Sequence, residues 1–298
     1  MGDPIELAVT RAIKAMQENL GEPLTVDDLA RAAMFSKFHF TRIFQRATGV
    51  SPGRFLSALR LQRAKHLLTS TSLTVADISI CVGYHSVGTF SSRFSRSVGM
   101  SPTTYRRMAG FAPHISTDPC IWRGQASSSR VSGWIRFAHG AQPGMIFVGL
   151  FPERIPQGRP VRCAVLPQAS HFSFKDVPVG MWYLLAQSVT CDPQAPLGEP
   201  DSAAQTVSVA SRGLLVVHRD SAISADLVLE PVRVLDPPVL LALLDVRKLA
   251  LSGADQAEPA GPSSVATAVP PAAALVGPGA AKRSYARTRP APLRANAA

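Results

Sequence analysis

This 298-residue sequence lacks the features of disulfide-stabilised, membrane-spanning and metal-binding proteins. Its four cysteines, Cys81, Cys120, Cys163 and Cys191, lie far apart, with no CxxC pair and no histidine at metal-ligand spacing. This pattern predicts reduced thiols rather than a disulfide framework or a zinc site. The longest apolar runs, 145–151 and 239–244, are too short to span a bilayer, and the first residues do not resemble a signal peptide. We therefore expect a cytoplasmic protein without a membrane partner.

Catalytic signatures are also missing. The segment from Gly49 to Gly53 fits the G-x-S-x-G pattern of a hydrolase nucleophile, but no strand precedes it, and Pro52 commits the residue after the serine to a helix start. The seven histidines form no HExxH arrangement, and no glycine-rich phosphate loop follows a strand. We expect neither enzyme activity nor a metal or cofactor.

Negative charge is scarce in the first third of the chain. Residues 1–112 carry 14 Lys and Arg against 7 Asp and Glu, whereas residues 113–251 carry 12 against 11 and residues 252–298 carry 5 against 2. A basic domain has the electrostatic character expected for phosphate binding, although a merely cationic, soluble surface gives the same composition.

A repeat of about fifty residues organises this basic region. Thr25 and Asp28, spaced as in a helix capping box, return as Thr74 and Asp77. Eight further positions return after one extra residue: Ser36, Phe40, Phe44, Arg46, Gly49, Ser51, Pro52 and Phe55 recur as Ser86, Phe90, Phe94, Arg96, Gly99, Ser101, Pro102 and Tyr105. Two helical modules of one design suit a partner that repeats in space, such as duplex DNA.

Apolar periodicity and capping residues predict an all-α tandem helix-turn-helix domain over residues 1–112. We expect an amphipathic first helix over 5–19 and a long connecting helix that starts at Pro52. Two matched helices, about 36–48 and 86–98, follow serine N-caps and end at Gly49 and Gly99.

Residues 5–110 resemble the DNA-binding domain of the AraC/XylS family of transcription regulators, here at the N-terminus. The matching stretches are 29–33, 36–44, 49–52, 60–64, 82–84, Phe90, Phe94 and 99–106. The resemblance implies seven helices and two recognition helices that enter successive major grooves of double-stranded DNA. It also implies an activator or other regulator, with RNA polymerase as a further candidate partner. Met34 departs from the family, many of whose members have glycine in that turn.

The resemblance and the exposed helix positions together give the candidate DNA-binding residues. They are Lys37, Phe38, His39, Thr41, Arg42, Gln45 and Arg46 in the first module, and His85, Val87, Gly88, Thr89, Ser91, Ser92, Arg93 and Arg96 in the second. Arg42 is suited to guanine, and Phe38 or Thr41 to a thymine methyl. Ser92 stands where many family members have a basic residue. We expect the first module to read bases and the second mainly to hold register.

Residues 113–251 change to short apolar runs separated by Gly, Pro and Ser, which predicts an all-β, sandwich-like regulatory domain, antiparallel as a sandwich or barrel. The expected strands are 131–137, 145–150, 161–166, 171–174, 182–189, 206–210, 214–218, 226–229 and 239–244. Trp122, Trp134, Trp182 and Tyr183 are candidates for the lining of a small-molecule effector pocket, but such aromatics more often lie in the core. A dimerisation or protein-binding surface is the other role open to this domain.

Residues 252–298, rich in Ala and Pro with five basic residues, predict a disordered tail. The sequence as a whole therefore predicts a sequence-specific DNA-binding transcription regulator. The alternative is a small-molecule-binding or protein-interaction protein whose β domain carries the main activity. That alternative leaves the repeat and its matched caps unexplained.

Overall fold

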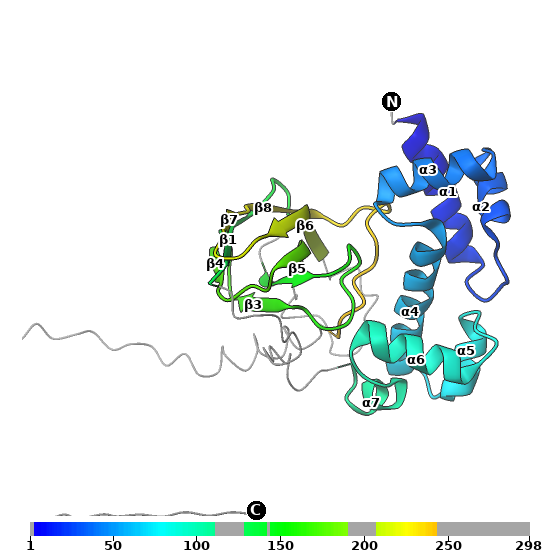
Figure 1. The fold of residues 1–298 in the computed structure, drawn as a ribbon. Helices are drawn as coiled ribbons and strands as arrows, with labels where there is room; N and C mark the ends of the chain where they lie inside the picture. The colour runs from blue at the N-terminus through cyan, green and yellow to red at the C-terminus, as the bar shows by residue number, and fades with distance from the viewer. Residues whose placement is uncertain (1–2, 111–127, 142–143, 190–206, 243–298) are drawn as a thin grey trace, which may run out of the picture. The chain divides into compact units, whose positions relative to one another are not determined.

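The computed structural model describes residues 3–110, 128–141, 144–189 and 207–242, all of which belong to one compact unit, Met1–Ala257. Along the chain, a helical region is followed by a β-rich region (Figure 1). The expected tail over 252–298 lies outside the described residues, as does Trp122.

Seven helices make up the helical region, as the family resemblance implies. They are α1 (Pro4–Glu18), α2 (Val26–Ala33), α3 (Lys37–Thr48), α4 (Pro52–Ser70), α5 (Val75–Cys81), α6 (Val87–Val98) and α7 (Pro102–Arg107). The two expected recognition helices correspond to α3 and α6. Both end at a glycine in the left-handed region, Gly49 with φ 77° and Gly99 with φ 93°, which confirms the predicted C-caps.

The capping boxes are duplicated as the repeat predicts. Thr25 Oγ1 accepts from the Asp28 amide at 3.2 Å, while Asp28 Oδ2 accepts from the Thr25 amide at 2.8 Å. Thr74 and Asp77 repeat the two bonds at 3.1 and 3.2 Å. Each box satisfies two amides that a helix start leaves without an intrahelical partner.

The serine caps are not duplicated in the same way. Ser86 accepts from the amide of Thr89, and Ser101 accepts from that of Thr104. Ser36 holds the N-cap position before α3, but its hydroxyl forms no capping bond. The predicted N-cap positions Ser36 and Ser86 are therefore confirmed, and the two caps differ only in the hydrogen bond of the hydroxyl group.

Each module is centred on three packed aromatic side chains. Phe44 lies 5.4 Å from Phe40 and 5.5 Å from Phe55, measured between ring centroids. In the second module Phe94 lies 5.7 Å from Phe90 and 5.5 Å from Tyr105. All six are fully buried, so the recurring aromatic positions in the sequence mark a duplicated core.

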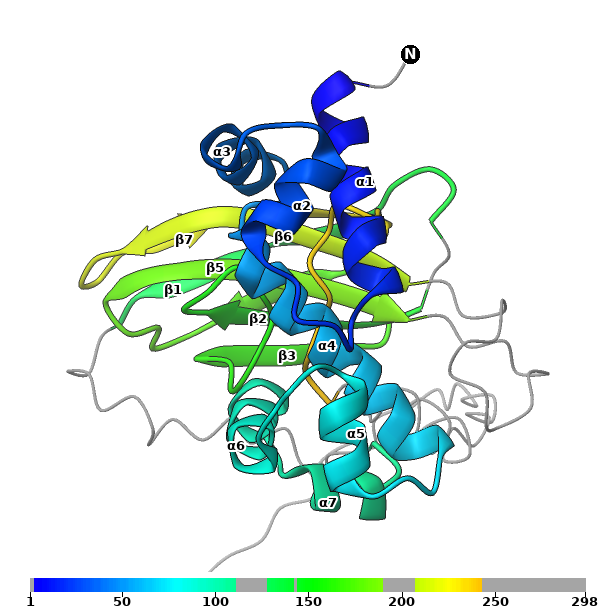
Figure 2. The same cartoon turned by 90° about the vertical axis from the view of Figure 1, so that its right-hand side faces the viewer.

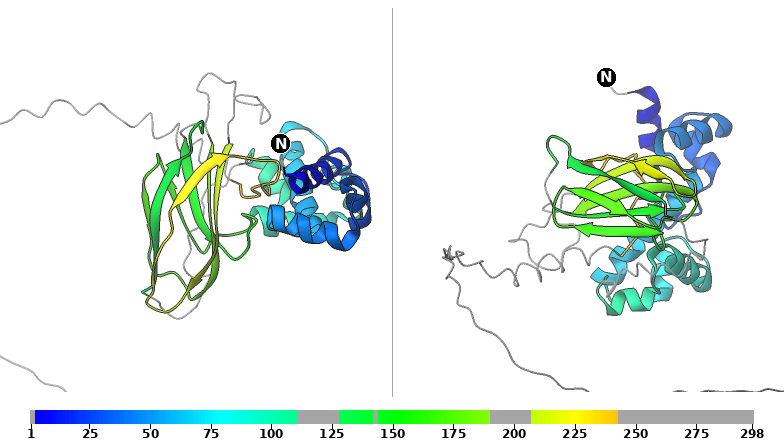
Figure 3. Two further views of the ribbon diagram at one scale, coloured as in Figure 1. Left: turned by 90° about the horizontal axis from the view of Figure 1, so that it is seen from above. Right: turned by 60° about the vertical axis from the view of Figure 1, so that its left-hand side comes forward.

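In the described part of the β-rich region there are eight strands: β1 (Arg130–Phe137), β2 (Met145–Phe151), β3 (Arg162–Leu166), β4 (His171–Phe174), β5 (Gly180–Val189), β6 (Val207–Val217), β7 (Ala222–Ser224) and β8 (Leu227–Pro231). They pair in the order β3-β2-β5-β6-β8-β1-β4, with β7 beside β1. The sheet curls until its end strands β3 and β4 meet, which makes a nearly closed barrel (Figure 3). The core lies between the two halves and includes Val131, Leu184 and Leu227.

The described residues confirm a β-rich region, with differences in detail from the prediction. β1 pairs parallel with β7 and β8, so the sheet is mixed rather than antiparallel. The expected strands 206–210 and 214–218 are one strand, β6, because Ser211 and Arg212 continue the ladder with β5, which resumes at Leu215 after an irregularity. The strand β7 was not expected. Trp182 lies in the core and Trp134 is half exposed against His171.

The last described segment, residues 232–242, is an extended C-terminal strap rather than a strand. Residues 239–242 form no ladder, which corrects the expected strand at 239–244 for the part described. Leu240 and Ala242 pack with the helical core, while Val239 and Leu241 pack with Phe147, Phe151 and Leu185 on the sheet. Side chains along the strap therefore alternate in direction as they would in a strand. One set packs on the helical core and the other set packs on the sheet.

Candidate nucleic-acid interface

The helices α3 and α6 lie across opposite ends of α4, with their axes in similar directions (Figure 2). The helix α4 has 19 residues and is therefore about 28 Å long at 1.5 Å per residue. This length is comparable to one turn of duplex DNA, about 34 Å. The connecting helix thus separates the two modules by about the repeat of a major groove.

The apolar face of α3 fixes which side chains remain available to a partner. Phe40, Ile43 and Phe44 are buried. Of the seven residues expected to contact DNA, Thr41 is half-buried and six are exposed: Lys37, Phe38, His39, Arg42, Gln45 and Arg46. The structure therefore brings all seven candidates onto the outer part of one helix.

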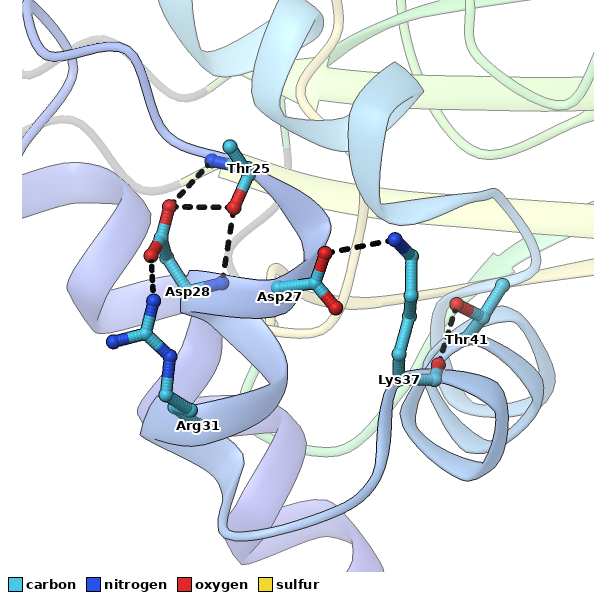
Figure 4. A network of polar contacts seen from close by, with 6 residues as sticks. All are labelled: Thr25, Asp27, Asp28, Arg31, Lys37 and Thr41. Carbon is cyan, nitrogen blue, oxygen red and sulfur yellow. Dashed lines mark hydrogen bonds and ion pairs between the residues drawn. The ribbon is translucent and has the colours of Figure 1, made fainter.

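Lys37 already has a partner within the protein. Its Nζ lies 2.7 Å from Asp27 Oδ2 on α2, and both side chains are about half exposed (Figure 4). The hydroxyl of Thr41 donates to the Lys37 carbonyl at 2.9 Å, so it is held along the helix. Asp27 was not among the expected site residues. The sequence itself indicates this pairing, because the two positions differ together in the second copy of the repeat. Ala76 stands in the place of Asp27, and Val87 stands in the place of Lys37.

The neighbouring carboxylate has a different role. Asp28 accepts hydrogen bonds from both the hydroxyl and the amide of Thr25, and these bonds, with the charge of Arg31, hold the pKa of Asp28 below its usual value. Arg31 pairs with the other oxygen of Asp28 (Figure 4). Asp28 is thus committed to the start of α2, whereas Asp27 faces α3.

Two large apolar side chains project beside the basic groups. Phe38 is 84% exposed and Met34 is 77% exposed. The His39 ring lies 4.9 Å from that of Phe35, which restrains it against the turn before α3. An exposed phenylalanine at the start of α3 leaves apolar surface in water, which costs the free protein hydrophobic free energy.

The second module presents a less charged surface. Ser91 is half-buried, while seven candidates on or before α6 are exposed: His85, Val87, Gly88, Thr89, Ser92, Arg93 and Arg96. Arg93 Nη1 reaches Ser57 Oγ on α4 at 3.4 Å, so its guanidinium is directed toward the connecting helix. Neither α3 nor α6 carries a carboxylate. Both surfaces are therefore compatible with a polyanion, and α3 has the greater hydrogen-bonding capacity.

Residues 29–108 match a family model described as a helix-turn-helix domain. The transcriptional activator AarP from Providencia stuartii is 32% identical over 91 residues, which cover 30% of this chain and 67% of the activator. The chain belongs to the AraC/XylS family. As a member of the AraC/XylS family, it is also 27% identical over 154 residues to the uncharacterised regulator YbfP of Bacillus subtilis, covering 52% of this chain and 50% of that relative.

A solved AraC-type regulator from Chromobacterium violaceum is 30% identical and has a TM-score of 0.33, covering 35% of this chain and 93% of that structure. The AraC/XylS-family chain spans half or less of the length of the first curated relatives it matches. In its described residues, no helix is long and apolar enough to cross a bilayer, and no cluster of His, Cys, Asp or Glu is arranged to hold a metal.

Proposed function

We propose that this protein is a sequence-specific regulator of transcription that binds double-stranded DNA with α3 and α6 in successive major grooves. The observation that carries the proposal is the pair of exposed, carboxylate-free helices at the two ends of α4. A helix with an exposed polar face fits the major groove, and a spacer of about 28 Å suits two adjacent turns.

The two modules divide the work of recognition in this proposal. Arg42 donates to guanine O6 and N7, while Phe38 contacts a thymine methyl. In the second module Val87 contacts a methyl, and Thr89 and Ser92 donate to bases or phosphates. Lys37 and Arg46 are placed for phosphate or base contacts on α3, and Arg96 for phosphate contacts on α6.

The regions of the chain take separate roles. Residues 1–112 bind DNA, and residues 113–251 regulate that binding. DNA as the partner implies a cytoplasmic protein, and RNA polymerase is the partner through which an activator acts. The regulatory role of the β-rich region is favoured by a cavity of about 200 Å³ on its sheet.

Gel shifts of the full chain on genomic fragments at physiological salt test the proposal. We expect discrete bands on a small set of fragments, well above binding to competitor DNA. Retardation of all fragments alike would contradict sequence-specific binding.

Replacing Arg42 by alanine tests the readout. We expect preference to relax at one base position, by about 1–3 kcal/mol, whereas Ser92→Ala has a smaller effect. The control Lys175→Ala removes an exposed positive charge from the β-rich region and leaves base preference unchanged. Equal weakening of Arg42→Ala on every sequence would make Arg42 a phosphate contact instead.

A further inference from the structure

The connection between β2 and β3 contacts both helix-turn-helix modules. Its residues 153–158, called here the β2–β3 bracket, reach the C-terminal ends of α3 and α6. We propose that the bracket fixes the distance between α3 and α6 and thereby sets the spacing of the two DNA half-sites that the protein binds. This inference rests on the proposed function and adds the residues that position the two helices.

At α3 the bracket supplies a positive charge. The Arg154 guanidinium fills the space that a Cβ at Gly49 would occupy, so it packs on the residue that ends the helix. The last carbonyl groups of a helix carry partial negative charge, which a nearby cation stabilises. The lack of a side chain at Gly49 thus admits Arg154 to the C-terminal end of α3.

At α6 the bracket supplies a backbone donor. The Gly158 amide donates to the Ser97 carbonyl at 2.7 Å. Ser97 lies one residue before the end of α6, where carbonyl groups have no amide partner within the helix. The ends of α3 and α6 are therefore bound by two groups, at Arg154 and Gly158, that lie four positions apart in one short segment.

A continuous chain of polar side chains joins the same two ends. Arg54, in the first turn of α4 directly after α3, pairs with Glu153. Gln157 Nε2 donates to the same oxygen of Glu153, and Ser97 Oγ on α6 donates to Gln157 Oε1 at 3.0 Å. Because Gln157 donates on one side and accepts on the other, each link of this chain orients the next.

Apolar contacts hold the bracket on the helical region. Ile155 is buried in the helical core, to which Leu240 of the strap also belongs. The Leu240 amide donates to the Pro156 carbonyl at 3.0 Å, which ties the strap to the bracket. The bracket is thus a fixed link between the modules, in addition to the covalent connection through α4.

The bracket leaves the proposed DNA contacts free. It meets the C-terminal ends of α3 and α6, whereas Phe38 and Val87 lie in the first turns of these helices and are exposed. Successive base pairs of DNA are about 3.4 Å apart, so a small shift between the helices corresponds to one base pair. The bracket should therefore control the choice of half-site spacing rather than the affinity for DNA in general.

Fluorescence anisotropy tests the proposal, with the full chain and its specific DNA site, in which one base pair is inserted or deleted between the half-sites. The isosteric variant Gln157→Glu places a second carboxylate beside Glu153 and breaks the polar chain without loss of volume. We expect the parent to prefer the natural spacing at least about tenfold, and this preference to fall at least about threefold in Gln157→Glu.

Two further variants serve as controls. The double variant Glu153→Gln, Gln157→Glu exchanges donor and acceptor, restores the hydrogen bond between the two positions and should recover most of the spacing preference. Gln168→Ala removes an exposed glutamine of the β-rich region outside the bracket and should bind as the parent does.

A second measurement needs no DNA. Spin labels on genetically encoded residues at positions 45 and 92, both exposed on α3 and α6, report the distance between the helices in the free protein. We expect one narrow distance distribution in the parent and in Gln168→Ala, and a broader one in Gln157→Glu.

Unchanged spacing preference or an unchanged distance distribution in Gln157→Glu would overturn the positioning role. Equal losses in the single and double variants would overturn it as well, because they would trace the effect to disturbed packing. If the parent gives no specific DNA band while the distance distribution still broadens in Gln157→Glu, only the function proposed above is overturned.

Discussion

Met34 and Gly83 occupy equivalent positions in the turns of the two modules, and both adopt the left-handed backbone, with φ of 63° and 76°. Only the second turn is closely packed. A Cβ at Gly83 would lie 2.5 Å from the Leu20 carbonyl oxygen, whereas the side chain of Met34 extends into solvent. The first turn therefore tolerates a side chain at the cost of backbone strain, which explains the departure from glycine at this position.

Met34→Gly should stabilise the protein. The left-handed conformation costs an ordinary residue about 1–2 kcal/mol, and glycine at this position removes that cost. Glycine also has more conformational freedom in the unfolded chain, which lowers stability and offsets part of the gain. We expect the free energy of unfolding in urea to rise by up to about 1 kcal/mol. The matched variant Gly83→Ala should lower it by more than about 1 kcal/mol, because backbone strain and contact with Leu20 add. A loss of stability in Met34→Gly would show that Met34 contributes packing.

In the proposed complex with DNA, Asp27 would compete with phosphate groups for Lys37. The ion pair is exposed on both sides and is worth at most about 1 kcal/mol. Asp27→Asn should leave the urea midpoint nearly unchanged and tighten binding to any DNA sequence by up to about fivefold, measured by fluorescence anisotropy. The double variant Asp27→Asn, Lys37→Ala should lose this gain. Tighter binding that persists in the double variant would assign the effect to general charge instead.

At the scale of elements, the capping boxes of α2 and α5 stabilise their helices through residues only three positions apart. Thr25→Ala and Thr74→Ala each remove the hydroxyl that accepts from the N3 amide. We expect each to lower the free energy of unfolding by about 1 kcal/mol, while Thr→Ser at either site retains the cap and most of the stability. Equal losses in the Ala and Ser variants would implicate the methyl group rather than the hydrogen bond.

Local signals also explain which elements could be predicted from the sequence. The helices follow from apolar spacing and from residues such as Thr25, Gly49 and Pro52, which act within a few positions. The sequence predicts two strands in place of β6, because Ser211-Arg212-Gly213 has the composition of a turn. In the structure, pairing with β5 keeps this part of the chain extended. The strap has the alternating apolar residues of a strand, but its backbone does not form a ladder with a neighbouring strand.

The candidate interface was predictable to a similar extent. Exposed positions of α3 and α6 follow from the helical period and the resemblance, so the exposure of Phe38 and Arg42 was predicted correctly. The pairing of Lys37 with Asp27 and the direction of Arg93 toward Ser57 depend on tertiary packing. The cavity was not predictable, because its walls come from three strands and the strap, which are distant in sequence.

At the scale of the whole molecule, Lys65 links α4 to the strap. Its Nζ donates to the Leu241 carbonyl at 2.8 Å, and burial lowers the pKa of Lys65 to about 8. Between pH 8 and about 10.5 the unfolded chain therefore binds more protons at this residue than the folded chain does. The contribution of Lys65 to stability rises with pH through this window.

Urea unfolding at pH 7, 7.5, 8, 9 and 10 tests this linkage against Lys65→Met, which cannot titrate. We expect the unfolding free energy of the parent, relative to that of the variant, to increase from pH 8 to pH 10 and to be level between pH 7 and 7.5. A constant difference across the whole range would mean that the ammonium remains hydrated in the folded protein.

The hydrogen bond from Lys65 to Leu241 joins positions 176 residues apart, and Leu240 and Ala242 complete the helical core beside it. During synthesis, the helices emerge from the ribosome long before the residues that close their core. At about 5–20 residues per second, the delay is roughly 10 to 35 s. Until the strap is made, the helical region therefore exposes the apolar surface that the strap later covers. We expect the chain to need chaperones most during this interval.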